Sequence, residues 1–383
     1  MADVAKPIIF TRPRRVFKNN TAVTAVAVTL DGCRMVSGSP NKILYLWDLK
    51  GGTVLKKMEG HRDTVWAVAI SGDGKIIASG DRDGEYIAWD GDTGNSLTRT
   101  IKAHSDKIGS LDFSPDSAVL ATVSLDKTIK LWSTTTWKIR GTPINVREHI
   151  DGVRYSPSGE FLAIVLTSQR IQIWKTDTSE RIAELAGNSH SLVWTPDGTR
   201  LLSGGNKSDP TIREWDTSTW KQVGDPWSGH TRFISALAID PTGTLLASAS
   251  HDGRVRLWRI SDRRNIAVFR HSHQFSCVTF SVDGKYILCG GEDGITEWGV
   301  PEGFIEGTSK AHVSTVRFSL FPALQPPHLA QGNAAKRCCK GTAGKQCEFL
   351  MVPILRLTSN LFTYRLETPI PRCVSTSHSW EAP

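Results

Sequence analysis

Short apolar runs alternate with Gly- and Asp-rich turns along most of the chain. In one stretch the runs cover residues 65–70, 76–80 and 85–89, and a weaker run covers residues 96–101. The turns interrupt every run before it could complete three helical turns, so the pattern predicts β-strands rather than helices. We therefore expect an all-β protein built from small antiparallel sheets of four strands each.

The spacing of the tryptophans shows an internal repeat. Seven of the thirteen recur at intervals of 40 to 43 residues, and these are Trp47, Trp89, Trp132, Trp174, Trp215, Trp258 and Trp298. A dipeptide of Asp, Ser, Thr or Gly, which favours hairpin turns, recurs in phase with them. A four-stranded sheet cannot bury both of its faces alone, so we expect seven sheets to stack radially into a closed ring.

Dipeptides at the ends and starts of the repeats carry a family resemblance. Repeats end in Trp47-Asp48, Trp89-Asp90 or Trp215-Asp216, and two begin with Gly60-His61 or Gly229-His230. Over residues 17–300 the chain resembles the Trp-Asp repeat (WD-repeat) family. The resemblance implies a seven-bladed β-propeller of four-stranded antiparallel blades, followed here by an irregular C-terminal tail.

Three repeats also share a set of polar residues, in which a His precedes the Trp by 28 positions and an Asp precedes it by 6. A catalytic Ser-His-Asp triad is needed once, whereas this set recurs in each structural unit, so we interpret it as structural. The resemblance implies a hydrogen-bonded chain from Asp to His to Ser or Thr to the indole. The sets are His61, Ser79, Asp83 and Trp89; His104, Thr122, Asp126 and Trp132; and His230, Ser248, Asp252 and Trp258.

The other repeats carry incomplete versions of this set. In the fourth repeat His149 is only 25 residues before Trp174 and no Asp precedes that Trp, and the fifth lacks the His. The seventh has Cys289 where a Ser or Thr is expected. We therefore expect blades four and five to be the least rigid.

The two ends of the chain set the domain boundaries. A ring needs a strand from one terminus to complete its last sheet, and we favour residues 8–14 over the competing residues 304–310. We assign residues 1–16 to this closing segment and residues 17–310 to the propeller. Residues 311–319 resemble the start of a repeat, and residues 320–383 are expected to form a poorly ordered tail.

Charge and cysteine content limit the possible functions. The net charge of +8 arises at the two ends, while residues 19–300 are balanced, so the ring has no broad phosphate-binding face. The seven cysteines lack the paired spacing of a disulfide framework or zinc site, and we expect no cofactor, no metal and no enzymatic activity. With neither a signal peptide nor an apolar run of membrane length, the expected location is cytoplasmic or nuclear.

The remaining function is binding of other proteins or peptides, by a monomeric propeller within larger assemblies. The alternative is a nucleic-acid or chromatin adaptor that uses the basic N-terminal segment and tail. The family resemblance places partner contacts on the face that carries the His loops and Asp turns, here called the top face. The corresponding residues are Thr64, Trp66, Arg82, Lys107, Leu125, Phe233, His251, Gln274 and Glu292. Trp66 could instead pack on a neighbouring blade.

Overall fold

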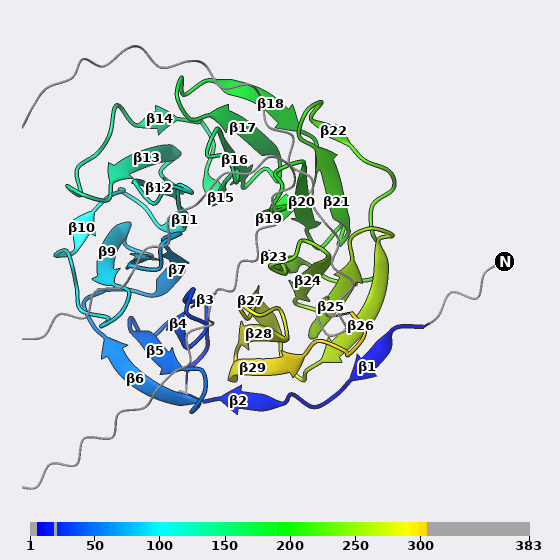
Figure 1. Cartoon of the computed structure of the whole chain (residues 1–383). Coiled ribbons are helices and arrows are strands. Elements are labelled where there is room, and N and C mark those ends of the chain that lie inside the picture. Colours follow the sequence, from blue (N-terminus) through cyan, green and yellow to red (C-terminus); the bar gives the residue numbers. More distant parts are fainter. Residues whose placement is uncertain (1–5, 19–20, 188, 305–383) are drawn as a thin grey trace, which may run out of the picture. The chain divides into compact units, whose positions relative to one another are not determined.

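The computed structural model describes residues 6–18, 21–187 and 189–304. Among these residues seven sheets surround a common centre, each with its first strand innermost (Figure 1). The expected seven-bladed β-propeller of antiparallel blades is confirmed. The segments 311–319 and 320–383 lie outside the described residues. In the described part, no helix is long and apolar enough to span a bilayer.

The first four blades follow one another in chain order. Blade one contains β3 (Ala25–Val28), β4 (Arg34–Gly38), β5 (Leu44–Asp48) and β6 (Thr53–Met58). Blade two contains β7 (Val65–Ile70), β8 (Ile76–Asp81), β9 (Glu85–Asp90) and β10 (Ile101–Lys102). Blade three contains β11 (Ile108–Phe113), β12 (Val119–Ser124), β13 (Thr128–Ser133) and β14 (Ile144–Asn145). Blade four contains β15 (Ile150–Tyr155), β16 (Phe161–Leu166), β17 (Ile171–Lys175) and β18 (Arg181–Leu185).

The last three blades complete the ring. Blade five contains β19 (Ser189–Trp194), β20 (Arg200–Gly205), β21 (Ile212–Asp216) and β22 (Lys221–Gln222). Blade six contains β23 (Ile234–Ile239), β24 (Leu245–Ser250), β25 (Arg254–Arg259) and β26 (Arg264–Arg270). Blade seven contains β27 (Phe275–Phe280), β28 (Tyr286–Gly291) and β29 (Gly294–Gly299).

Turn chemistry explains why the inner strands begin and end where predicted. Between β7 and β8 the Asp73 carboxylate accepts bonds from the Ser71 hydroxyl and the Lys75 amide, at 2.6 and 3.1 Å. Gly74 takes a positive φ of 73° there, which costs least for glycine. The three inner strands of blade two consequently match their predicted ranges to within one residue.

The predicted outer strand of blade two, residues 96–101, is wrong. The regular strand β10 covers only Ile101–Lys102, and Ser96 makes an isolated bridge with Trp89. The amides of Leu97 and Thr98 both donate to the Ala88 carbonyl, at 2.8 and 3.3 Å. A regular ladder does not direct two successive amides to one acceptor, so the strand cannot extend through this segment.

The hydrophobic core lies between adjacent blades. Trp89 of blade two is 2% exposed and packs in one cluster with Val36 and Leu46 of blade one. Trp258 of blade six packs in the same way with Leu202 of blade five. Both faces of each sheet are therefore covered, which is why nearly every residue of the second strands is buried.

The N-terminal segment closes the ring, but with residues later than those predicted. Strand β2 (Arg15–Phe17) pairs antiparallel with β29 and becomes the fourth strand of blade seven. Strand β1 (Ile8–Phe10) instead pairs parallel with β26, as a fifth strand of blade six. Pro13, which has no amide hydrogen to donate, lies between these strands. The prediction of one closing strand over residues 8–14 is therefore wrong.

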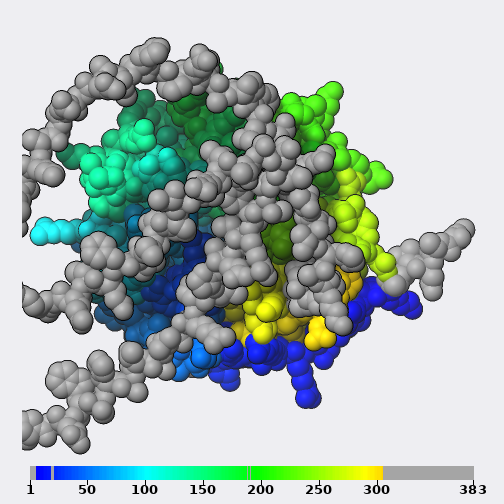
Figure 2. Space-filling model, viewed as in Figure 1, coloured from blue at the N-terminus to red at the C-terminus, as the bar shows by residue number. Residues whose placement is uncertain are grey.

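The closing strand is held by buried contacts. Phe17 is 1% exposed, and its ring meets Trp47 of blade one edge-on at 5.9 Å between centroids. Arg14 forms an ion pair of 2.8 Å with Glu297 of β29. In space-filling view the blue N-terminal residues lie against the yellow residues of blade seven (Figure 2). Of the competing segment 304–310, residues 305–310 lie outside the described residues.

Candidate partner-binding surface on the top face

The polar chains of blades three and six have the geometry that the resemblance implies. In blade three His104 contacts Asp126 at 3.0 Å through Nδ1 and Thr122 at 2.8 Å through Nε2, and the Trp132 indole donates to Thr122 at 2.9 Å. The corresponding distances in blade six are 2.9, 2.7 and 2.8 Å, for the residues His230, Asp252, Ser248 and Trp258. Each chain fixes a His loop and an Asp turn at the same end of its blade.

Burial controls the protonation of these histidines. Desolvation lowers the pKa of His104 and of His230, although each contacts an Asp carboxylate that opposes the shift. Both imidazoles are therefore neutral near pH 7. A neutral ring has one N–H donor and one acceptor nitrogen, which suits its position between a carboxylate and a hydroxyl.

Blade two corrects one predicted member of the chain. The Nδ1 atom of His61 bonds to Asp81 at 2.8 Å, and Asp83 is exposed. Asp81 ends β8 inside the sheet, is fully buried, and also accepts the Glu85 amide at 2.9 Å. Because the Asp81 carboxylate already occupies the bonding position at Nδ1 of His61, the Asp83 side chain points into solvent instead. The rest of the chain, through Ser79 to Trp89, is as predicted.

The four other repeat tryptophans also find acceptors, by two routes. Trp47 and Trp215 donate to Ser37 and Ser203 on the neighbouring second strand, both at 2.9 Å. Trp174 and Trp298 donate to a residue two positions earlier on their own strand, at 3.2 and 2.9 Å; these acceptors are Gln172 and Thr296. The second route was not predicted from the sequence, although a polar residue two positions before the Trp indicates it.

A repeated backbone bond positions the predicted partner-binding residues. The amide of Arg82 donates to the Thr64 carbonyl at 3.0 Å, and that of Leu125 donates to Lys107 at 3.1 Å. Each bond links the start of an innermost strand to the turn after the second strand. Val65, which lies between Thr64 and Trp66, is fully buried, whereas Thr64 is partly exposed and Trp66 is 44% exposed.

Five of the nine predicted residues surround one pocket between blades two and three. Its volume is about 420 Å³, and it is lined by Thr64, Trp66, Arg82, Asp106, Lys107 and Leu125. The Lys107 ammonium lies 3.9 Å from the centroid of the Trp66 ring, within the range of a cation–π interaction. Trp66 remains 44% exposed, so contact with blade three covers only part of the indole.

The charge around this pocket is mixed but leaves Lys107 poorly solvated. Burial lowers the pKa of Lys107, and Arg82 adds to the shift, while Asp151 and Asp106 oppose it. The pKa of Lys107 is lowered because burial of the ammonium outweighs the attraction of these two carboxylates. A carboxylate entering the pocket would stabilise the charged form of Lys107. Asp106 was not among the predicted residues, although it directly precedes Lys107.

The other four predicted residues lie elsewhere on the top face. Phe233 lines a second pocket, of about 580 Å³, together with Gln169, Asn206, Lys207 and Ser208. His251 meets the Phe233 ring edge-on at 4.6 Å. Gln274 and Glu292 belong to blade seven and line neither of these pockets. The contacts that partners make with all nine residues stay a prediction.

Two family models match overlapping parts of the chain. A model described as the first β-propeller of IFT122 matches residues 22–195, and the WD domain, G-beta repeat, matches residues 180–216, 220–259 and 263–296. The chain belongs to the WD-repeat β-propeller family. The matches cover all seven repeat tryptophans except Trp298, which lies just beyond the last of them.

Curated relatives of this WD-repeat chain belong to several differently named proteins. Periodic tryptophan protein 2 of Arabidopsis thaliana is 28% identical over 68% of this chain and 25% of its own length. U3 small nucleolar RNA-associated protein 15 of Schizosaccharomyces pombe is 26% identical over 73% of this chain and 56% of its own. Pre-mRNA-processing factor 19 homolog 2 of Arabidopsis thaliana is 26% identical over 55% of this chain and 41% of its own length. The chain thus spans a quarter to just over half of these relatives.

Proposed function

We propose that this WD-repeat protein is a non-catalytic scaffold that binds partner proteins or peptides on the top face of its propeller. The observation that carries the proposal is the pocket between blades two and three. It combines a half-exposed Trp66 with Arg82, Lys107 and the partly buried Leu125. Trp and Arg are enriched among the residues that dominate binding energy at protein interfaces.

The pocket suits a peptide that presents an apolar side chain next to a carboxylate. The indole and Leu125 supply apolar surface, and the partly buried Lys107 supplies a site for negative charge. Asp106 on the rim would disfavour an acidic group on that side and so fixes the orientation of the peptide. Charge complementarity of this kind contributes specificity and a faster association rate more than affinity.

The alternative of a nucleic-acid adaptor has less support from the N-terminal segment. Arg14 and Arg15 contact the Glu297 carboxylate at 2.8 and 3.4 Å, and Arg15 also donates to the Leu49 and Lys50 carbonyls. These cations are engaged in closing the ring, and fewer of them remain for phosphate groups. The main role that these contacts support for the N-terminal segment is therefore structural.

The names of the relatives suggest where such a scaffold works. Two of them are named for association with U3 small nucleolar RNA and for pre-mRNA processing. We accordingly propose a cytoplasmic or nuclear location, as a monomeric propeller within larger protein or protein–RNA assemblies. Contact with RNA in such an assembly would be made by its partners.

The double variant Trp66→Ala with Arg82→Glu tests the proposal. Because Trp66 and Arg82 are exposed, the thermal midpoint should stay nearly unchanged. Affinity capture followed by mass spectrometry should show loss of the proteins that the wild type captures. Binding of each lost protein is then measured in purified form.

A matched control is the double variant Leu55→Ala with Lys57→Glu. Leu55 is 54% exposed and Lys57 is exposed on the outer strand β6 of blade one, so the control removes similar apolar surface and reverses one charge. It should capture the same proteins as the wild type. Equal capture by all three proteins, or an unfolded Trp66/Arg82 variant, would reject the assignment of this pocket.

A further inference from the structure

Blade seven departs from the complete blades at its top turn. In blade six the pair Ser250↔Arg254 encloses a three-residue turn that contains Asp252. In blade seven the pair Gly291↔Gly294 encloses only Glu292 and Asp293. The shorter turn leaves the Asp293 carboxylate exposed, whereas Asp252 is held against His230.

Blade seven also lacks the Ser or Thr hydroxyl that bonds to the histidine in a complete blade. Ser248 of blade six, which bonds to both His230 and Trp258, corresponds to Cys289 of blade seven. The Trp298 indole donates to Thr296 instead. His271 is consequently half-buried, and its Nδ1 atom accepts the backbone amide of His273 at 3.3 Å.

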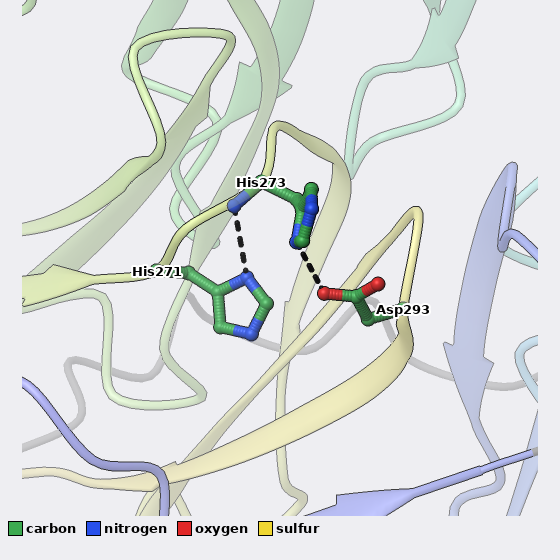
Figure 3. A group of neighbouring side chains, drawn as sticks. All are labelled: His271, His273 and Asp293. Atoms are coloured by element: carbon green, nitrogen blue, oxygen red, sulfur yellow. Dashed lines mark hydrogen bonds and ion pairs between the residues drawn. The ribbon is translucent and has the colours of Figure 1, made fainter.

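These two changes bring three metal-ligand side chains together at the top of blade seven (Figure 3). One ligand atom from each of His271, His273 and Asp293 lies within 4.8 Å of the other two. Nδ1 of His273 contacts the Asp293 carboxylate, and the Ser272 hydroxyl lies 3.0 Å from the same nitrogen. The ligands come from the loop before β27 and from the turn between β28 and β29.

We propose that His271, His273 and Asp293 form a binding site for a divalent transition-metal ion, with Zn²⁺ as the best fit. Zinc binds imidazole nitrogen and carboxylate oxygen at similar distances and accepts four tetrahedral ligands. Two imidazoles disfavour Ca²⁺ and Mg²⁺, which prefer oxygen ligands. Tetrahedral zinc ligands lie about 3.3 Å apart. The two exposed side chains can close the remaining gap by rotation.

The surroundings favour a metal site with one rigid ligand, two exposed ligands and one open coordination position. The His271 ring packs 5.5 Å from the ring of Phe275, which is 2% exposed and fixes the first ligand. The side chains of His273 and Asp293 are 45% and 48% exposed. Three protein ligands leave the fourth position to water or to a donor from a bound protein.

Cobalt serves as a spectroscopic probe for zinc in the test. The reduced full-length protein is stripped of metal with a chelator, titrated with Co²⁺ and then with Zn²⁺ as competitor. We expect ligand-field absorption of bound Co²⁺ that saturates at one equivalent of Co²⁺ per chain, with no thiolate-to-metal charge-transfer band. Addition of Zn²⁺ should abolish this absorption. This signature separates the site from any set of cysteine ligands in the chain.

Four single variants decide whether these residues are the ligands. His273→Gln and Asp293→Asn should each weaken Co²⁺ binding at least tenfold, because each removes one of three ligands. Glu302→Gln and His149→Gln change exposed residues outside the cluster and should bind as the wild type does. Absent binding, binding with a thiolate signature only, or binding that persists in both ligand variants would overturn the proposal. In those cases the contact of His273 with Asp293 is an ion pair and nothing more.

Discussion

Single buried polar atoms determine which of several similar residues belongs to a blade's polar chain. The sequence contains two acidic candidates for blade two, Asp81 and Asp83, and spacing alone selects the second. The structure selects the first, because its carboxylate is fully buried and has two bonding partners. The spacing of a repeat predicts the chemistry of a position but not which of two neighbouring residues reaches it.

The choice between these two residues can be tested by substitution. Asp81→Asn should lower the free energy of unfolding by about 1.5 to 3 kcal/mol, since it replaces the buried side-chain partner of His61 and of the Glu85 amide. Asp83→Asn, the matched control at an exposed position, should change it by less than about 0.5 kcal/mol. Urea unfolding of both variants measures the difference. A larger effect from Asp83→Asn would restore the assignment made from spacing.

Individual strands were predictable where turn chemistry and apolar runs agree. Strands β7, β8 and β9 satisfy both conditions, and their ranges were predicted to within one residue. Three of the fourth strands are very short, so the sequence contains a weak signal for them; β10, β14 and β22 have two residues each. The closing strand could not be placed, because its partner β29 is nearly the whole propeller away in sequence.

Differences between blades should appear in hydrogen exchange. Among the described residues of blades four and five, within 146–215, no hydrogen-bonded chain joins Asp, His, Ser or Thr and Trp, whereas blades two and three, residues 61–132, have one each. We expect amides of the second and third strands to exchange faster in blades four and five, because fewer buried bonds must break to open them. Native-state exchange followed by mass spectrometry measures this. Equally slow exchange in the two regions would contradict the prediction.

At the scale of the whole molecule, ring geometry determines which predicted residues act together. Blades two and three are neighbours, so Trp66 and Arg82 share a pocket with Lys107 and Leu125. The family resemblance supplied these positions one by one, but nothing in the sequence shows the size of the space between them. The blade seven cluster was missed because Cys289 was interpreted only as a weakened polar chain, and nothing in the sequence shows that His271, His273 and Asp293 lie together.

Ring closure can be tested by two truncations. A chain that lacks residues 1–11 loses β1, whose Ile8 and Ile9 are about half exposed, and should remain folded with a modest loss of stability. A chain that lacks residues 1–18 also loses β2 and the buried Phe17, and it leaves the edge of β29 unpaired. It should unfold at markedly lower temperature and associate at high concentration. Thermal unfolding and light scattering compare the two, and equal stability would show that β2 does not close the ring.

Pairing of β2 with β29 also has a consequence for biosynthesis. Arg14 and Glu297, which the closure joins, are 283 residues apart. The ribosome adds about 5 to 20 residues per second, so roughly 15 to 60 s pass between the synthesis of Phe17 and the synthesis of its partner strand β29. During this time the strand Arg15–Phe17 is unpaired and the Phe17 ring, which is buried in the closed propeller, is exposed to solvent until translation reaches the last blade.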